Sequence, residues 1–592
     1  MDFIPAARYE GFRPGYVFKT DSRGLGYYAD IRGAVDRVSK DKRRVDDDNV
    51  RADQKTKRPR MEPSAVEEVL DRADDIPAQS LDATTLKAKL VSFERRINKN
   101  QEMRMKFPSN PEKFLESEIE LHDELQELFP VAASPELFPL FVSLGALKSV
   151  LGVLTHENTD VSLAALTLLQ ELTDPDTFAA EDLDETADVF VLVNEFVKEQ
   201  GIELIVQNLA RLDESQEEDA LGISHTLTII ENLIEAKANL ADEICRRTSI
   251  MAYLLRKLTQ QSFDPIKLHC SEILAILLQN SSPNQESLPT VEVDGRNGFE
   301  LLLQIIFSCR KMVPSTTEEA ESIENVFLSL RSALLIPKNR DMFLEHEGFE
   351  LMMKCLKEGA YAAGCALKTL SFAITSSTAS CVRFVEVGGL KYLFPAFMGK
   401  STTKNFTKKK GVKLELEQSA ISILSELCSR LVLFPEDVGM RSIFPRLMSK
   451  FSENDQEKVH RCVELLTKYK LEVKATEGEL VLLRRDIVAT GDNIALEEFD
   501  SDEYRYAKLL SGGLFTLQQV TKVIALVYLY GGEKAQETIT ERLVSAGSSI
   551  TDVIVIMREA AARIPADSDQ VTGERSVFVI LSAALSRIRS AN

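Results

Sequence analysis

The sequence predicts an all-α protein built as a superhelical solenoid of repeats, with a helical cap before the repeats and a helical domain after them. Apolar residues make up 44% of the 592-residue chain. They recur with the period of a helix, whereas almost no segment alternates with the period of a strand. Glycines that each precede an apolar helical stretch stand at positions 145, 201, 298, 348 and 389. Recurrence of one such unit every roughly 20 to 50 residues is typical of a solenoid.

Residues 134–174 contain one complete unit of three expected helices. Ser134 is expected to cap a short helix that ends at Gly145. The second helix carries an apolar stripe at helical spacing, formed by Leu147, Val150, Leu151 and Leu154. Residues 161–172 predict a third helix that is apolar over most of its circumference, as expected when its own repeat and the next one cover it. Three helices in roughly 40 residues are typical of an armadillo or HEAT repeat.

The spacing of the glycines predicts about six repeats over residues 131–475. The intervals are 56, 97, 50 and 41 residues. The longest interval is about twice the armadillo or HEAT period of roughly 40 to 47 residues, and the apolar segment Met251–Leu258 fills its middle. Each repeat can bury its apolar face only against its neighbours, so we expect a superhelix whose third helices form a long concave surface.

The segments that flank the repeats differ from them in composition. Residues 1–85 lack helical periodicity and are expected to form a mostly disordered tail. The first 30 residues place aromatic side chains among glycines, either as a docking peptide or as a local turn that packs on the repeats. Residues 86–130 predict an N-terminal helical cap, which a repeat stack needs for solubility. Residues 476–592 predict a helical domain that closes the other end of the stack.

Two basic clusters in the tail predict a nuclear localisation signal that an import receptor would read. A solvated run of charges is the alternative interpretation. The clusters consist of Lys42, Arg43 and Arg44, and of Lys55, Lys57, Arg58 and Arg60. Because they lie in an accessible tail of an otherwise acidic chain, the nucleus is the favoured location.

The folded part of the chain is expected to be strongly acidic. The formal net charge is −21, yet residues 1–60 hold 15 Lys and Arg against 10 Asp and Glu. An acidic superhelix repels a phosphate backbone and attracts basic polypeptide, so direct nucleic-acid binding is disfavoured. Six lysines in residues 400–413 leave open a contact with RNA or acidic protein, or a solvated loop. No apolar run approaches the roughly 18 residues that span a bilayer, so no membrane segment is expected.

Nothing in the sequence indicates an enzyme, a cofactor or a metal site. The eight cysteines are scattered singly through apolar segments, and no histidine has a second histidine three or four residues away. Reduced core thiols and structural histidines are therefore expected. The chain carries no nucleophile elbow, phosphate-binding loop or dinucleotide fingerprint. Whether the protein forms a homodimer stays open.

Several long stretches resemble the catenin-beta-like family of nuclear armadillo proteins associated with the spliceosome. The matching residues are 93–121, 157–174, 205–215, 267–280 and 451–469. The resemblance implies a non-enzymatic subunit of the Prp-nineteen-type splicing complex, located in the nucleus. It also implies that the protein binds basic localisation-type segments of partners such as a Myb-repeat splicing factor. Residues 56–60 resemble the localisation signal in the tail of that family.

A groove for basic peptides would need a chemistry other than that of import adaptors. Armadillo adaptors of the importin-alpha type, the alternative function, hold lysines with Trp and Asn at i and i+4 on successive third helices, and this chain has no Trp. Carboxylates can receive Lys and Arg instead, through charge-assisted hydrogen bonds. A solvated helix face is the other interpretation of such residues. The candidates are Asp160, Thr167, Glu171, Asp174, Thr228, Glu231, Asn232, Glu235 and Glu272.

Overall fold

The chain divides into two compact units, Met1–Gln79 and Ser80–Asn592. The computed structural model describes residues 3–5, 16–21, 24–29, 81–175, 188–400, 410–490, 496–497, 499–565 and 573–591. Both basic clusters of the predicted localisation signal lie outside the described residues, as does most of the lysine-rich segment. The predicted boundaries between cap, repeats and C-terminal domain stay predictions.

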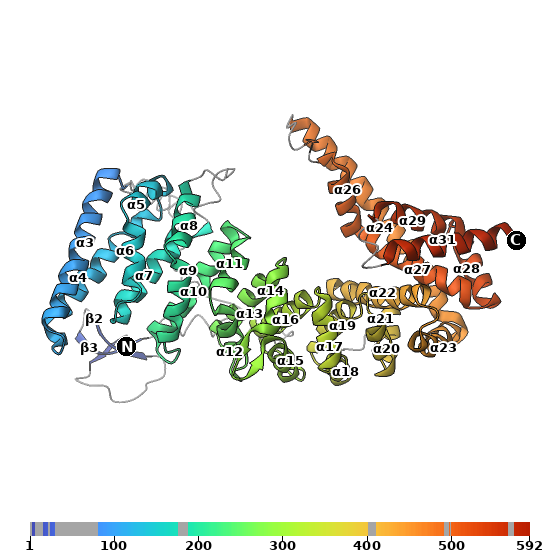
Figure 1. The fold of residues 1–592 in the computed structure, drawn as a ribbon, viewed down its shortest axis with the longest axis horizontal. Helices are drawn as coiled ribbons and strands as arrows, with labels where there is room; N and C mark the ends of the chain where they lie inside the picture. Colours follow the sequence, from blue (N-terminus) through green and yellow to red (C-terminus); the bar gives the residue numbers. More distant parts are fainter. Residues whose placement is uncertain are drawn as a thin grey trace, which may run out of the picture. The chain divides into compact units, whose positions relative to one another are not determined.

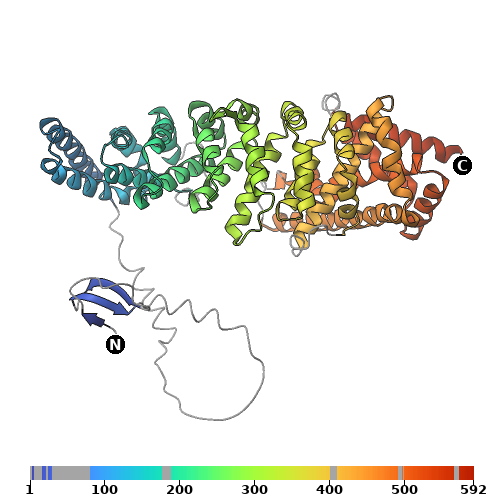
Figure 2. The same ribbon diagram turned by 90° about the horizontal axis from the view of Figure 1, so that it is seen from below.

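The first unit contains a small antiparallel sheet that the sequence analysis did not predict. Its strands are β1 (Phe3–Pro5), β2 (Tyr16–Asp21) and β3 (Gly24–Ala29), in the order β1-β3-β2, drawn in dark blue in Figure 2. Phe18 pairs with Tyr27 across β2 and β3. Phe3 likewise pairs with Tyr28 across β1 and β3, and aromatic residues favour strands.

The second unit begins with two long helices that precede the repeats. These are α3 (Ala83–Lys106) and α4 (Leu115–Gln126). The Asp82 carboxylate accepts a hydrogen bond of 2.7 Å from the Thr85 amide and so caps α3. One face of α3 is buried through Leu86, Leu90 and Phe93. Because α4 packs against both α3 and α7 of the first repeat, the pair covers the start of the repeat stack.

Between residues 138 and 433 the described helices form six consecutive triplets (Figure 1). The first helices are α5 (Phe138–Ser143), α8 (Asp188–Lys198), α11 (Leu240–Arg247), α14 (Ser282–Ser287), α17 (Pro337–Glu345) and α20 (Thr378–Glu386). The second helices are α6 (Ala146–Val153), α9 (Gly201–Asn208), α12 (Ile250–Leu258), α15 (Gly298–Cys309), α18 (Gly348–Glu358) and α21 (Leu390–Phe397). The third helices are α7 (Thr159–Leu172), α10 (Glu217–Ala236), α13 (Pro265–Leu278), α16 (Thr317–Ala333), α19 (Ala362–Ala373) and α22 (Lys410–Leu433).

Each third helix packs against the third helix of the next repeat, so these six helices form one continuous layer. The predicted fold class, an all-α solenoid of the armadillo type, is confirmed. A short hairpin interrupts the helices between α14 and α15. Its strands are β4 (Glu292–Val293) and β5 (Arg296–Asn297).

The first repeat confirms the three predicted helices and corrects the start of the first one. Gly145 has a φ of +75° and ends α5, as predicted. The chain enters the repeat through a 3-10 turn, Pro135–Leu137, before α5 begins at Phe138. The Ser134 side chain makes no capping hydrogen bond and is only 8% exposed. The prediction that Ser134 caps this helix is therefore wrong, because the residue is packed into the core.

The glycines that begin the second helices are required by a close approach of an aromatic ring. A Cβ atom at Gly201 would lie 2.7 Å from the ring of Phe196, and one at Gly348 would lie 2.4 Å from the ring of Phe343. The same relation holds between Gly389 and Phe384, also at 2.4 Å. In each pair the phenylalanine precedes the glycine by five residues. The ring of the first helix therefore occupies the space that a side chain at the start of the second helix would need.

The C-terminal part is a cluster of helices around α27. Its helices are α23 (Val438–Ser452), α24 (Glu457–Thr490), α26 (Asp502–Leu509), α27 (Phe515–Tyr530), α28 (Glu533–Ser545), α29 (Ile550–Arg563) and α31 (Glu574–Ala591). Helix α27 packs against α22, α24 and α31. Among the described residues, only the helical stretch Asp502–Tyr530 is by itself long and apolar enough to cross a membrane. Its most apolar part is 72% buried within the structure, as in the core helix of a helical bundle.

Candidate peptide-binding face

The layer of third helices exposes one side along the repeats, which we call the third-helix face. In α10 the side chains outside the core include Ser224, Thr228, Glu231 and Glu235, which are spaced by four, three and four residues. This is the spacing of one face of a helix. The buried residues of the same helix, such as Leu227 and Ile230, point into the core. The polar pattern of α10 therefore places these four side chains on one surface.

Carboxylates from three successive repeats converge on this face. Glu231 of α10 lies 3.2 Å from His269 of α13, measured between Oε2 and Nε2. Burial raises the pKa of Glu272, also on α13, above its ordinary value. His269 opposes this shift, and the negative charges of Glu321 on α16 and of Glu231 add to it. We call Glu231, Glu272 and Glu321 the acidic cluster, because their mutual repulsion would be relieved by a bound cation.

An acidic pocket of about 670 Å³ lies at the N-terminal ends of α10 and α13. Its charged lining residues are Glu214, Glu217, Glu218, Asp264 and Lys257. The Lys257 ammonium is 3% exposed and lies 2.6 Å from Glu214 and 2.9 Å from Asp264. One lysine therefore satisfies two of the four carboxylates. Glu217 and Glu218 remain exposed to solvent at the mouth.

The sequence-predicted candidates divide into exposed and internally bonded residues. Asp160 and Glu235 are exposed, whereas Glu171 and Asp174 are half-buried. Glu231 and Glu272 belong to the acidic cluster described above. The hydroxyls of two further candidates donate to carbonyls of their own helices: Thr167 to Leu163 at 2.9 Å and Thr228 to Ser224 at 3.1 Å.

Asn232 does not lie on the third-helix face. Its side chain is 6% exposed, and its amide nitrogen lies 3.4 Å from the hydroxyl of Thr173 in the preceding repeat. The structure therefore places this candidate in the core between repeats. The acidic pocket, in contrast, was missed, although the acidic run at residues 213–219 spans the start of α10. Its significance depends on Asp264, which only the fold brings beside that run.

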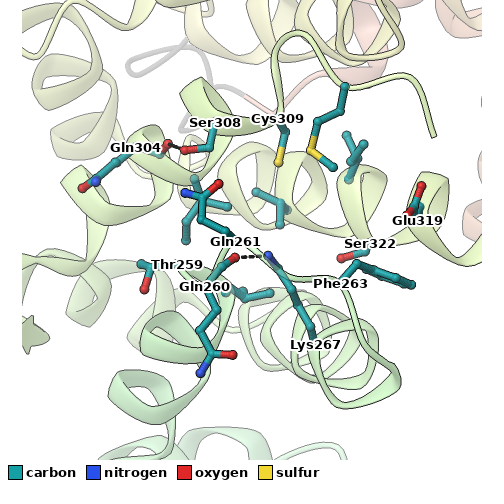
Figure 3. A pocket seen from close by; sticks show the side chains of 15 residues that line it. Thr259, Gln260, Gln261, Phe263, Lys267, Gln304, Ser308, Cys309, Glu319 and Ser322 are labelled. Atoms are coloured by element: carbon teal, nitrogen blue, oxygen red, sulfur yellow. Dashed lines mark hydrogen bonds between the residues drawn. The ribbon is translucent and has the colours of Figure 1, made fainter. Parts of the chain in front are cut away.

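A smaller pocket between α13, α15 and α16 does not match a ligand site (Figure 3). Its volume is about 90 Å³, against roughly 300 to 1,000 Å³ for ligand pockets. Lys267 donates to the Gln260 carbonyl within it. Burial raises the pKa of the Cys309 thiol at its wall. Burial likewise raises the pKa of the other seven cysteines, so none of the eight thiols is activated for reaction as a thiolate.

The raised pKa of Glu272 has a measurable consequence for stability. Because the folded state holds the proton of Glu272 more tightly than the unfolded state does, ionisation of this group costs stability as the pH rises through the raised pKa. At pH values well below the ordinary glutamate range that cost is absent. We expect Glu272→Gln to raise the melting temperature at pH 7 and to change it little at pH 3.5.

Scanning calorimetry at both pH values checks this prediction. The exposed Glu235 supplies the matched control, since Glu235→Gln removes one charge from the same face without relieving a buried carboxylate. An equal change for Glu272→Gln at both pH values would show that ionisation of Glu272 is not opposed.

Three-helix repeats in series, joined by a continuous layer of third helices, define an armadillo-type solenoid. A family model described as "Catenin-beta-like, Arm-motif containing nuclear" matches residues 64–558. The chain therefore belongs to this catenin-beta-like family, which confirms the resemblance noted in the sequence.

Two relatives show how far the similarity extends. The human Beta-catenin-like protein 1 is 40% identical over 488 residues, which are 82% of each chain. The Beta-catenin-like protein 1 homolog of Schizosaccharomyces pombe is 33% identical over 417 residues, 69% of each chain. The similarity thus covers more than the repeats alone.

Proposed function

We propose that this protein is a nuclear, non-enzymatic scaffold of a spliceosome-associated complex of the Prp-nineteen type. It binds basic localisation-type segments of splicing factors, such as a Myb-repeat factor, across the third-helix face. The observation that carries the proposal is the position of Glu231, Glu272 and Glu321 on the third helices of three successive repeats, where the charges of Glu231 and Glu321 act on Glu272. The description of the family as nuclear and the two basic clusters of the tail support the location.

The charges of the third-helix face favour lysine and arginine side chains of a partner. The acidic pocket presents four carboxylates and a single buried lysine. A cation that enters this face gains charge-assisted hydrogen bonds, which are about twice as strong as neutral ones. A bound cation also offsets the repulsion between neighbouring carboxylates. Basic polypeptide gains both effects, whereas a phosphate backbone would meet repulsion.

The alternative function, an import adaptor of the importin-alpha type, has less support from the site. The Trp/Asn ladder that such an adaptor needs is missing its Trp throughout the sequence. Asn232, which falls in register with the ladder, is buried between repeats. Affinity purification from nuclear extract separates the two functions. Splicing factors with basic segments are expected among the captured proteins, whereas importin-beta with assorted cargo would favour the adaptor.

Charge reversal tests the proposed binding face directly. We expect the double variant Glu171→Lys, Glu235→Lys to weaken binding of a Lys- and Arg-rich peptide by about 100-fold, since each lost charged hydrogen bond is worth about 1.5 to 3 kcal/mol. Fluorescence anisotropy gives the affinity. Far-UV circular dichroism and the melting temperature should stay unchanged, because Glu235 is exposed and Glu171 only half-buried.

A matched control separates the face from the net charge of the protein. Glu136→Lys, Glu345→Lys changes the net charge equally at two exposed positions outside the third helices, one in the 3-10 turn before α5 and one on α17. This control should bind the peptide nearly as well as the wild type. Intact binding by the folded Glu171 and Glu235 variant would remove the third-helix face as the peptide site.

A further inference from the structure

A second pocket on the third-helix face has the opposite charge character to the acidic one. It measures about 640 Å³ and lies where α16, α19 and α22 meet the start of α27. Its charged lining residues are Arg331, Lys368 and Glu415. Two aromatic side chains also line it, Phe372, which is 37% exposed, and Phe515, which is 47% exposed. We call this site the Arg331 pocket.

Arg331 is held in this pocket without a partner for its Nε donor. That atom is buried and makes no hydrogen bond in the described part of the chain. Burial lowers the pKa of the guanidinium, and the carboxylates of Glu415 and Glu324 oppose the shift. Both carboxylates are engaged elsewhere, since Glu415 pairs with Lys368 and Glu324 accepts the hydroxyl of Tyr361. A buried donor left unpaired costs stability, so the contacts within the described protein do not fully satisfy this guanidinium.

We propose that the Arg331 pocket binds an anionic group, a carboxylate or a phosphate, on the same partner polypeptide whose basic segment lies over the acidic cluster. The inference rests on the proposed function and adds a second requirement to the partner. Arginine presents several donors in a planar fork that suits such oxygens. Phe372 and Phe515 offer apolar contact to the residues beside the anion.

The geometry of α16 sets the spacing between the two parts of the partner. Arg331 follows Glu321 of the acidic cluster by ten residues on this helix, which is about 15 Å at roughly 1.5 Å per residue. An extended chain advances about 3.3 Å per residue. The anionic residue should therefore stand roughly five residues from the basic segment.

The experiment measures binding of three peptides to the full chain by fluorescence anisotropy. Each peptide has the same Lys- and Arg-rich segment and a five-residue spacer, followed by Glu, phosphoserine or Gln; a second set places this residue before the segment. We expect the Glu or phosphoserine peptide to bind about tenfold tighter than its Gln counterpart in one orientation. Tighter binding of the anionic peptides would indicate a cationic pocket. On a face that was acidic throughout, an added negative charge would weaken binding of the peptide.

Arg331→Met should abolish the preference for the anionic peptide and leave binding of the Gln peptide unchanged. The matched control is Arg246→Met, at an exposed arginine on α11, which should keep the preference. A larger gain for phosphoserine identifies phosphate as the natural group, and a larger gain for Glu identifies carboxylate.

Two kinds of result would overturn the inference, and only one of them would also overturn the proposed function. Equal affinities of the Glu, phosphoserine and Gln peptides in wild type, or a preference that survives in Arg331→Met, would remove the Arg331 pocket and keep the proposed function. Failure of all peptides to bind would remove both. The wild-type comparison needs no variant, so it decides the matter even if Arg331→Met folds poorly.

Discussion

Gly348→Ala is expected to destabilise the fifth repeat by about 1 to 3 kcal/mol, the usual cost of overpacking a core. A Cβ atom at this position would lie 2.4 Å from the ring of Phe343, which is fully buried. The ring cannot move freely, because it also packs edge-on against Phe349 at 5.2 Å between ring centroids. Alanine is normally the better helix former, so a loss of stability here would oppose the intrinsic trend.

The double variant Phe343→Ala, Gly348→Ala distinguishes the clash with the ring from a general effect of placing alanine at position 348. Phe343→Ala alone should cost about 3 to 5 kcal/mol through the cavity that it leaves. In that background the cost of Gly348→Ala should nearly vanish, which gives a coupling energy of about 1 to 3 kcal/mol in a double-mutant cycle measured by urea unfolding. Strictly additive losses would show that ring and glycine do not constrain each other.

Gly152 is the matched control for the glycine prediction. It lies within α6, and a Cβ atom built there meets nothing within 4 Å. Gly152→Ala should therefore stabilise the protein by about 0.5 to 1 kcal/mol, because alanine costs less backbone entropy in a helix.

Glu417→Ala is expected to cost about 3 to 5 kcal/mol, as when one partner of a buried ion pair is removed. The Glu417 carboxylate is 7% exposed and receives three donors from α24. Arg461 and Lys468 both approach it to 2.5 Å, and the Tyr469 hydroxyl donates at 2.9 Å. Without the carboxylate, the buried Tyr469 hydroxyl loses its acceptor. The half-buried Arg461 guanidinium keeps only the exposed Glu464 and the Phe397 carbonyl.

Comparison with Glu464 isolates the effect of burial in this prediction. Glu464 pairs with the same Arg461 at 2.7 Å, but its side chain is 66% exposed. Glu464→Ala should cost at most about 1 kcal/mol, as for other surface ion pairs. Chemical denaturation of both variants checks the difference. Equal losses would mean that the network around Glu417 contributes no more than a surface pair.

The local features of the first repeat could be predicted from the sequence because they depend on short-range signals. The period of its apolar residues and the left-handed Gly145 sufficed to place its three helices. The β4–β5 hairpin also carried a local signal that was missed. Asp294 and Gly295 have φ values of +51° and +77°, and an Asp-Gly pair between short strands is a strong hairpin signal.

The candidate site could be predicted in character but not residue by residue. Glu231 and Asn232 are neighbours in the sequence, yet the first belongs to the acidic cluster and the second is buried against the preceding repeat. Which of the two faces outward depends on how α10 is rotated against α7 and α13, and that rotation is set by packing. The same holds for Arg331, whose unpaired donor becomes visible only beside α19 and α22.

The position of α27 determines when the last repeat can be completed during synthesis. Helix α22 is covered by α27 and α31, and the Gln519 amide of α27 receives the Ser425 hydroxyl of α22 at 2.5 Å. Lys522 of α27 is in turn neutralised by Glu574 of α31 at 2.7 Å. Because the chain emerges from the ribosome N-terminus first, the earlier repeats can assemble as they appear. The apolar side of α22 in the sixth repeat must therefore stay uncovered until α27 and α31 have been made.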